Sequence, residues 1–223
     1  MNLRTLYWRW IGVNAVGELF GLGLTLGAGF WIIASFNDQG GVGGVLLAFA
    51  VAVLSGTIEA AIVGLLQWWA MHPWFPSISR LRWWLGTLGG ALLAYVLGYL
   101  PSTLMDLSQA TAPAEQAPMV EPPQWLVLLL AAGLGAVAGA MLSFAQWLAM
   151  RGVVKGSKIW IPANMLAWAA GMPLIFAGID LAQRLQPLWQ ILSVMAVVLL
   201  ITGAVVGAIH GALLVRLARS ARD

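Results

Sequence analysis

Two acidic residues inside long apolar stretches are the first candidates for chemistry in this sequence. Glu18 lies nine residues after Arg9, and Glu59 lies twelve residues before Met71 in the next apolar stretch. At 1.5 Å per residue, these acids lie about 13 and 18 Å from the same end of two helices. If the helices are neighbours the carboxyl groups meet, and two close carboxyls cannot both ionise. Such a pair suits a proton relay or a hydrogen bond to a ligand carbonyl; alternatively, each neutral acid bonds a neighbouring helix.

A single histidine is the candidate ligand for a cofactor. His210 lies six residues before Arg216, among the small residues Gly207, Ala208 and Gly211. Small neighbours leave room for a flat macrocycle, so the histidine could bind the magnesium of a chlorin or the iron of a haem. An ordinary hydrogen bond between helices is the other interpretation, because no second ligand accompanies this histidine.

Four side-chain amides lie at a similar depth. Asn14, Gln67, Gln146 and Asn164 each lie about two helical turns inside the ends that carry Arg or Lys. Amides in this position most often bridge helices, and each contributes about 1 kcal/mol. A solute site would use the same residues. However, the layer lies to one side rather than at the membrane midplane, where transporters usually bind their substrates.

Other kinds of chemistry are disfavoured. The chain has no cysteine and two histidines, which leaves no thiolate, disulfide or zinc site to expect. The glycine run in 21–27 is not a dinucleotide fingerprint, because no strand precedes it. We therefore predict a protein that is not an enzyme and has no metal site. The net charge is +3, but the basic residues lie in short segments beside the apolar stretches, where membrane topology accounts for them. We therefore expect no nucleic-acid partner.

The elements that must position these residues are membrane helices. The chain of 223 residues is 61% hydrophobic and 9% charged, whereas soluble domains carry roughly 25% charged residues. About 20 apolar residues span the hydrocarbon core. We predict one all-α transmembrane domain over 1–223, a six-helix bundle whose longest outer loop is 101–124. The expected helices are about 7–36, 45–71, 81–100, 125–150, 159–178 and 188–217.

The basic residues give the expected orientation, since cytoplasmic segments collect Lys and Arg. Six helices place ten of the eleven basic residues on one side, with only Arg184 on the other. The ten are Arg4, Arg9, Arg80, Arg82, Arg151, Lys155, Lys158, Arg216, Arg219 and Arg222. We therefore expect a multi-pass membrane protein with both termini in the cytoplasm.

Three stretches, 56–72, 135–151 and 203–219, share a pattern of small residues four positions apart. Such ridges allow the backbones of helices to approach closely in lipid. The first two stretches continue into Gln67-Trp68 and Gln146-Trp147, and the third has Leu214-Val215 there. The spacing of two helices per copy predicts three tandem hairpins in parallel orientation. Chance similarity among helices rich in small residues is the alternative.

Tryptophan is frequent and unevenly placed, with nine of the 13 near the expected cytoplasmic interface. Trp10, Trp84 and Trp160 each begin an odd-numbered helix. An aromatic belt at the level of the headgroups is the simpler interpretation. A flat aromatic surface for a pigment, a quinone or a lipid is the alternative.

The stretch 135–151 and the following Trp160 resemble a loosely defined group of uncharacterised bacterial multi-helix membrane proteins. Members of that group carry repeated Gly-rich helices that end in Gln-Trp and Arg, as Gly139, Gln146, Trp147 and Arg151 do here. In the first copy His72 replaces the arginine, and the third copy departs from the pattern at Leu214. The resemblance implies no established activity. It favours a bacterial origin and, by association, a role beside bioenergetic or photosynthetic complexes.

These observations leave three functions open. The first is a non-enzymatic accessory or scaffolding subunit, in contact with lipid and with other membrane subunits or further copies of itself, or a binder of a hydrophobic ligand. The second is a proton-coupled transporter or channel that uses Glu18 and Glu59. The third is a subunit that binds a chlorin or a haem through His210.

Overall fold

The computed structural model describes residues 2–36, 41–111 and 122–220. Within these ranges the chain forms six long α-helices and one short 3₁₀ helix, and no strand occurs there. All six helices are long and apolar enough to cross a membrane. Their bounds are α1 Leu3–Phe36, α2 Gly41–Met71, α3 Arg80–Thr111, α4 Gln124–Met150, α5 Trp160–Gln183 and α6 Leu188–Ser220, with the 3₁₀ helix η1 at Ser157–Ile159.

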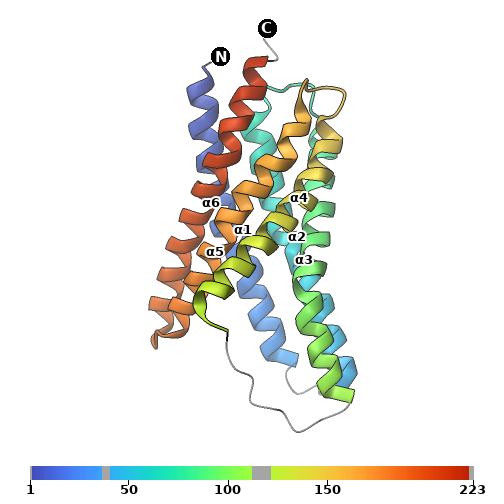
Figure 1. The fold of residues 1–223 in the computed structure, drawn as a ribbon, viewed down its shortest axis with the longest axis vertical. Helices are drawn as coiled ribbons and strands as arrows, with labels where there is room; N and C mark the ends of the chain where they lie inside the picture. The colour runs from blue at the N-terminus through green and yellow to red at the C-terminus, as the bar shows by residue number, and fades with distance from the viewer. Residues whose placement is uncertain (1, 37–40, 112–121, 221–223) are drawn as a thin grey trace.

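The six helices form a closed ring. Each packs against its neighbours in the sequence, and α1 also packs against α6, which closes the ring between the first and last helices. Because the helices alternate in direction, α1 begins and α6 ends at the same end of the bundle (Figure 1). The ring encloses a central axis onto which polar residues from any helix can converge.

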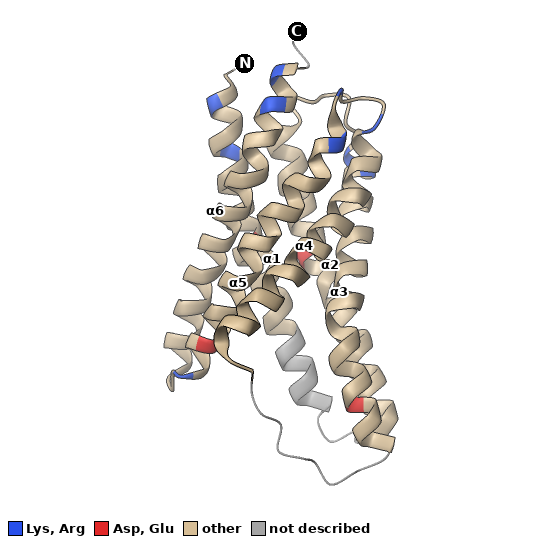
Figure 2. Cartoon of the chain, in the orientation of Figure 1, with Lys and Arg blue, Asp and Glu red and all other residues tan. Residues whose placement is uncertain are grey.

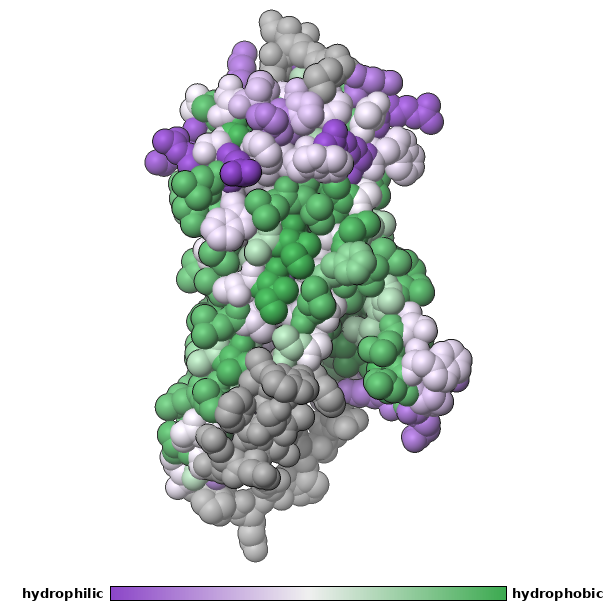
Figure 3. Space-filling view, turned by 180° about the vertical axis from the view of Figure 1, so that it is seen from behind, coloured by the Kyte–Doolittle hydropathy of each residue, from purple (hydrophilic) through white to green (hydrophobic). Residues whose placement is uncertain are grey.

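Basic residues gather at the end where α1 begins and α6 ends (Figure 2). We call this end the basic end; it carries Arg4, Arg9, Arg80, Arg82, Arg151, Lys155, Lys158, Arg216 and Arg219. At the opposite end Arg184 pairs with Asp180 at 2.8 Å. An apolar belt covers much of the surface beyond the basic end (Figure 3). Arg222, Asp38, Glu115 and Glu121 lie outside the described residues.

The predicted loop at 101–124 is wrong in its first half. Helix α3 continues through Pro101 to Thr111. Proline removes one backbone donor and usually ends a helix. Here the hydroxyl groups of Ser102 and Thr103 both donate to the carbonyl of Tyr99, at 2.9 Å each. Both bonds end on a single carbonyl, whereas the carbonyl that the proline leaves without its usual donor is that of Leu97. Apolar residues at helical spacing continue beyond the proline. Helix α5 is likewise longer than predicted and ends at Gln183 rather than near residue 178.

The turn between α4 and α5 depends on two glycines. Gly152 and Gly156 have φ angles of 83° and 74°, which are conformations that only glycine adopts readily. The turn carries Lys155 and Lys158, so it presents charge at the basic end while the chain reverses direction.

The core lies toward the basic end, where aromatic side chains fill the axis of the ring. Trp10, Trp83 and Trp160 are fully buried, and the ring of Trp160 lies 5.9 Å from each of the other two. Trp84, which was predicted to begin the third helix, lies next to Trp83 and is only partly buried. These three tryptophans, which we call the aromatic core, close the basic end. Other tryptophans, such as Trp8, face outward.

Candidate functional site

A layer of hydrogen-bonded amides lies directly beneath the aromatic core. The indole nitrogen of Trp160 donates to the side-chain oxygen of Gln146 at 2.9 Å. The Gln146 amide donates to Gln67 at 3.1 Å and to the hydroxyl of Thr87 at 3.0 Å. The Gln67 amide in turn donates to Asn14 at 2.8 Å. This chain of bonds connects α1, α2, α3, α4 and α5 across the bundle axis.

The three odd-numbered helices share the same hydrogen bond between a side chain and the backbone. On each, a polar residue four positions after a buried tryptophan donates its side-chain hydrogen to the carbonyl of that tryptophan. The pairs are Asn14 with Trp10 at 2.8 Å, Thr87 with Trp83 at 3.0 Å, and Asn164 with Trp160 at 2.9 Å. The structure therefore brings all four predicted amides to this layer and adds Thr87. Its spacing from Trp83 matches that of the two asparagines from their tryptophans.

His210 lies against the aromatic core, and it also lines a small void beneath the amide layer. Its Nδ1 accepts a hydrogen bond of 2.7 Å from the indole nitrogen of Trp10. Its ring centroid is 5.5 Å from Trp10 and 5.4 Å from Trp160. A side chain added at Gly207 would lie 3.1 Å from Cα of Ile11 on α1. The small residues beside His210 thus allow α1 to approach α6, and α1 fills the room expected for a macrocycle.

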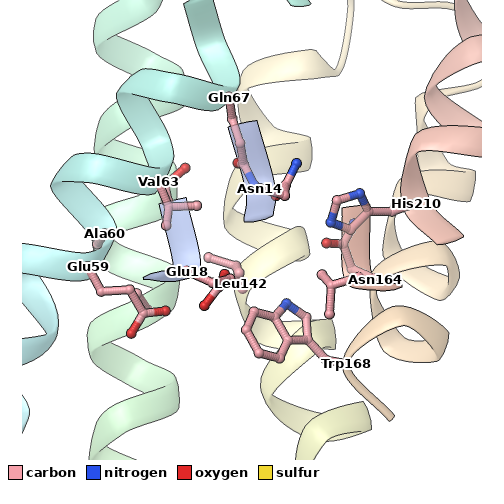
Figure 4. A pocket seen from close by; sticks show the side chains of 13 residues that line it. Asn14, Glu18, Glu59, Ala60, Val63, Gln67, Leu142, Asn164, Trp168 and His210 are labelled. Carbon is pink, nitrogen blue, oxygen red and sulfur yellow. The ribbon is translucent and has the colours of Figure 1, made fainter. Parts of the chain in front are cut away.

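Glu18 and Glu59 line the same small void beneath the amide layer. The void has a volume of about 20 Å³, which is enough for one water molecule. Figure 4 shows both acids around it, with Asn14 and Gln67 on one side and Trp168 on the other. Helices α1 and α2 pack closely here, as the position of Gly21 shows: a Cβ added there would lie 3.1 Å from Cα of Glu59. The two acids are therefore neighbours in the structure.

The two acids differ in their partners. Glu59 is partly buried, and one of its carboxyl oxygens accepts a hydrogen bond from the hydroxyl of Tyr95. Glu18 is 1% exposed, and its Oε2 has no hydrogen-bond partner among the described residues. A buried polar atom without a partner is unfavourable, so a water, a proton or a ligand is the natural complement in the void.

A larger cavity adjoins the void on the side away from the basic end. It has a volume of about 360 Å³ and shares four lining residues with the void. The four are Glu59, Ala91, Leu142 and Trp168. The rest of the wall is mainly apolar and comes from α1, α3, α4 and α5. The ribbons of α3 and α4 diverge toward the end opposite the basic end, on either side of this space (Figure 1).

Tyr95 and Tyr99 are the residues that sequence reasoning missed. Both line the cavity, and they are two of only three tyrosines in the chain. Residues four apart lie on the same face of a helix, so the sequence could have predicted that the two tyrosines lie side by side. The partner of Tyr95, however, lies on another helix and 36 residues away, so the pairing depends on the tertiary structure.

The cavity has room for a small molecule, and the carboxyl groups of Glu18 and Glu59 can each bind a proton. Drug-sized ligands bind in mostly apolar cavities with a few polar groups that fix their orientation, and this cavity has such groups at its inner end. Among the described residues no cluster of three His, Asp or Glu side chains could hold a metal ion. Comparisons with protein-family models, with curated proteins and with solved structures find no match for this chain.

Proposed function

We propose that this chain is a non-enzymatic multi-pass membrane protein that binds a hydrophobic small molecule in the cavity between α3 and α4. The observation that carries the proposal is the cavity itself, about 360 Å³ with an apolar wall and a glutamate–tyrosine pair at its inner end. The aromatic core closes the axis on the other side of the amide layer. A cavity closed at one end suits retention of a ligand.

We further propose that the six helices cross a bacterial inner membrane or another internal membrane, with the basic end in the cytoplasm. The concentration of Arg and Lys at that end supports this orientation, because cytoplasmic loops carry an excess of both residues (Figure 2). The cavity then lies nearer the outer leaflet. A lipid-soluble ligand would reach it from the outer side of the membrane or from within the bilayer.

The bundle is best described as three parallel units of two helices. The tryptophan and its polar partner recur on α1, α3 and α5. Small residues recur at matching positions of the even helices, where Gly139 packs on α5 and Gly207 packs on α1. The units are the tandem hairpins α1–α2, α3–α4 and α5–α6, and in the closed ring the last unit also packs against the first through α6 and α1. The indole bonds differ among the three tryptophans: Trp160 bonds Gln146 and Trp10 bonds His210, whereas the indole nitrogen of Trp83 has no partner among the described residues.

Proton-coupled transport is the second candidate function. Glu18 favours it, because this buried acid has an oxygen without a partner and shares a void with Glu59. Transport would require the aromatic core to open, since Trp10, Trp83 and Trp160 fill the axis between this void and the basic end. Glu59→Gln separates the candidates: it should abolish coupled flux in vesicles if the protein is a transporter.

The remaining predicted roles stay predictions. A chlorin- or haem-binding role is disfavoured by the contacts of His210, whose Nδ1 already accepts the Trp10 indole proton. An accessory role beside other membrane subunits would use exposed apolar side chains, which suit lipid equally well. Purification of the chain with other subunits, or with a chromophore that His210→Ala removes, would support those roles.

The test of ligand binding is native mass spectrometry of the protein extracted gently from its own membrane. We expect a small hydrophobic molecule to be retained by the natural protein and lost from Gly98→Leu. Gly98 lines the cavity, and a Cβ there would meet nothing within 4 Å, so leucine can occupy the cavity without a clash.

Gly89→Leu is the matched control for this test. Gly89 is also on α3 and also has nothing within 4 Å of an added Cβ, but it does not line the cavity. The control should retain the ligand. Release from both variants, or retention by both, would contradict the proposed site.

A further inference from the structure

One acid at the inner end of the cavity and a second in the adjoining void have no base opposite them. Glu18 and Glu59 line the void, and Glu59 also lines the larger cavity. None of the described residues that line either space is Lys or Arg. A charged carboxylate without a partner is strongly unfavourable in a membrane interior, and either a proton or a cation relieves it. The site is therefore complementary to positive charge.

The polar groups around the inner end of the cavity include acceptors of negative character and two neutral donors, the hydroxyl of Tyr99 and the indole N–H of Trp168, which can also turn toward the acids. Tyr95 already donates its hydroxyl proton to Glu59, so that proton is not available to a ligand carbonyl. The second oxygen of Glu18 is an acceptor without a donor. A ligand that brings positive charge fits this imbalance, whereas an anionic ligand would be repelled by any ionised acid.

Aromatic rings complete the environment. Tyr95, Tyr99, Trp168 and Phe176 all line the cavity, from α3 on one side and α5 on the other. The faces of aromatic rings attract cations, and the attraction is strengthened where water is excluded. An acid beside several rings in an otherwise apolar cavity is a combination that recognises an organic cation with apolar substituents.

We propose that the ligand of this cavity is a lipophilic monocation, such as a substituted ammonium, with Glu59 as its counter-ion. This inference rests on the proposed function, since it names the class of ligand that the cavity takes. Glu18 acts as a positioning residue that lines the void beside Glu59, and the proton that the cation displaces from Glu59 is released to the solvent. The volume of about 360 Å³ accommodates a head group with one aryl or short alkyl substituent.

Competition between the cation and a proton gives the proposal a pH dependence. The titratable groups that face the two acids are each other, Tyr95 and Tyr99 from α3, and His210 from α6. The residues of α4 and α5 that line the two spaces contribute no titratable group. Acidification protonates the counter-ion, so the dissociation constant for the cation should rise by about tenfold per pH unit where one proton is exchanged.

The experiment measures binding of phenylpropyltrimethylammonium to the whole protein in lipid nanodiscs by equilibrium dialysis. Its neutral isostere, in which carbon replaces the nitrogen, is measured in parallel. We expect the cation to bind at least about tenfold more tightly, as a desolvated charge pair does. We expect Glu59→Gln to remove that difference, and Asp106→Asn, a change at an exposed acid of α3, to preserve it.

A second variant keeps the proposal testable if Glu59→Gln misfolds. Tyr95→Phe keeps the carboxyl group of Glu59 and removes the hydroxyl that competes for it, so it should bind the cation at least as tightly as the natural protein. Equal binding of the cation and its neutral isostere would overturn this inference. Loss of neutral binding in Gly98→Leu but not in Gly89→Leu would then leave the proposed function standing. Binding of neither probe would contradict both.

Discussion

At the scale of single residues, the layer beneath the aromatic core is a set of amides whose bonds are mutually satisfied. Gln146 is its centre, since it accepts from Trp160 and donates to Gln67 and Thr87. A fully connected network in a low-dielectric interior stabilises one arrangement of the helices, and a partly broken one leaves orphaned groups. These residues therefore have a structural role that is complete without any ligand.

Gln146→Leu should destabilise the protein by about 1 to 3 kcal/mol, because it orphans the indole N–H of Trp160 and removes the donor to Gln67. Gln183→Leu, at the exposed end of α5, is the control and should change stability little. Unfolding in mixed micelles with rising SDS measures both variants. Similar stabilities for the two would show that the network contributes nothing.

The bond between His210 and Trp10 should appear as an interaction energy in a double-mutant cycle. Trp10→Phe removes the donor and His210→Leu removes the acceptor at 2.7 Å. We expect a coupling of about 1 kcal/mol between the two changes, measured from the same unfolding transitions. Strict additivity of the two substitutions would contradict the structural role assigned to His210.

At the scale of helices, glycines allow backbones to touch. A Cβ added at Gly139 of α4 would lie 2.9 Å from the carbonyl carbon of Asn164 on α5, and one added at Gly86 of α3 would lie 2.7 Å from the carbonyl oxygen of Ala145 on α4. Both neighbours are main-chain atoms, which cannot rotate away as a side chain can. Close packing of this kind replaces the hydrophobic effect as the source of helix association in lipid.

Two alanine substitutions on α4 should therefore have opposite effects. Gly139→Ala should destabilise the bundle by about 1 to 3 kcal/mol, because the added methyl group overlaps the backbone of α5. Gly133→Ala, where an added Cβ meets nothing within 4 Å, should stabilise the helix by about 0.5 to 1 kcal/mol. Thermal unfolding in detergent, followed by circular dichroism, compares them. A stabilising Gly139→Ala would refute the close approach.

At the scale of the whole molecule, charge and packing give the bundle two different ends. The basic end is closed by the aromatic core and carries most of the charge, whereas α3 and α4 diverge toward the other end beside the cavity (Figures 1 and 2). The proposed orientation makes the open side the outer one. In that orientation a ligand would enter the cavity from the outer side of the membrane or from within the bilayer.

The orientation is testable because the chain has no cysteine. Ser108→Cys places one thiol near the end opposite the basic end, and Lys155→Cys places one in the turn between α4 and α5; both positions are exposed. A membrane-impermeant maleimide on intact cells should label Ser108→Cys and should label Lys155→Cys only after lysis. The reverse pattern would show that the basic end faces outward.

The helical class, the six apolar spans and the similar depth of Glu18 and Glu59 could be predicted from the sequence alone. These follow from composition and from distance along a single helix, which are local quantities. The predicted end of the third helix near residue 100 is wrong, because apolar residues at helical spacing continue beyond Pro101 and the helix extends to Thr111. The function and the roles of the site residues stay predictions.

Only the tertiary structure decided which residues meet. It closed the ring with α1 against α6, turned Trp83 rather than Trp84 inward, and joined Trp10 to His210 across 200 residues. It also left the cavity beside Tyr95, which no local pattern predicts. The physical reason is that the rotation of each helix about its axis is fixed by packing against its neighbours. A residue's depth can be read from one helix, but its partner depends on two.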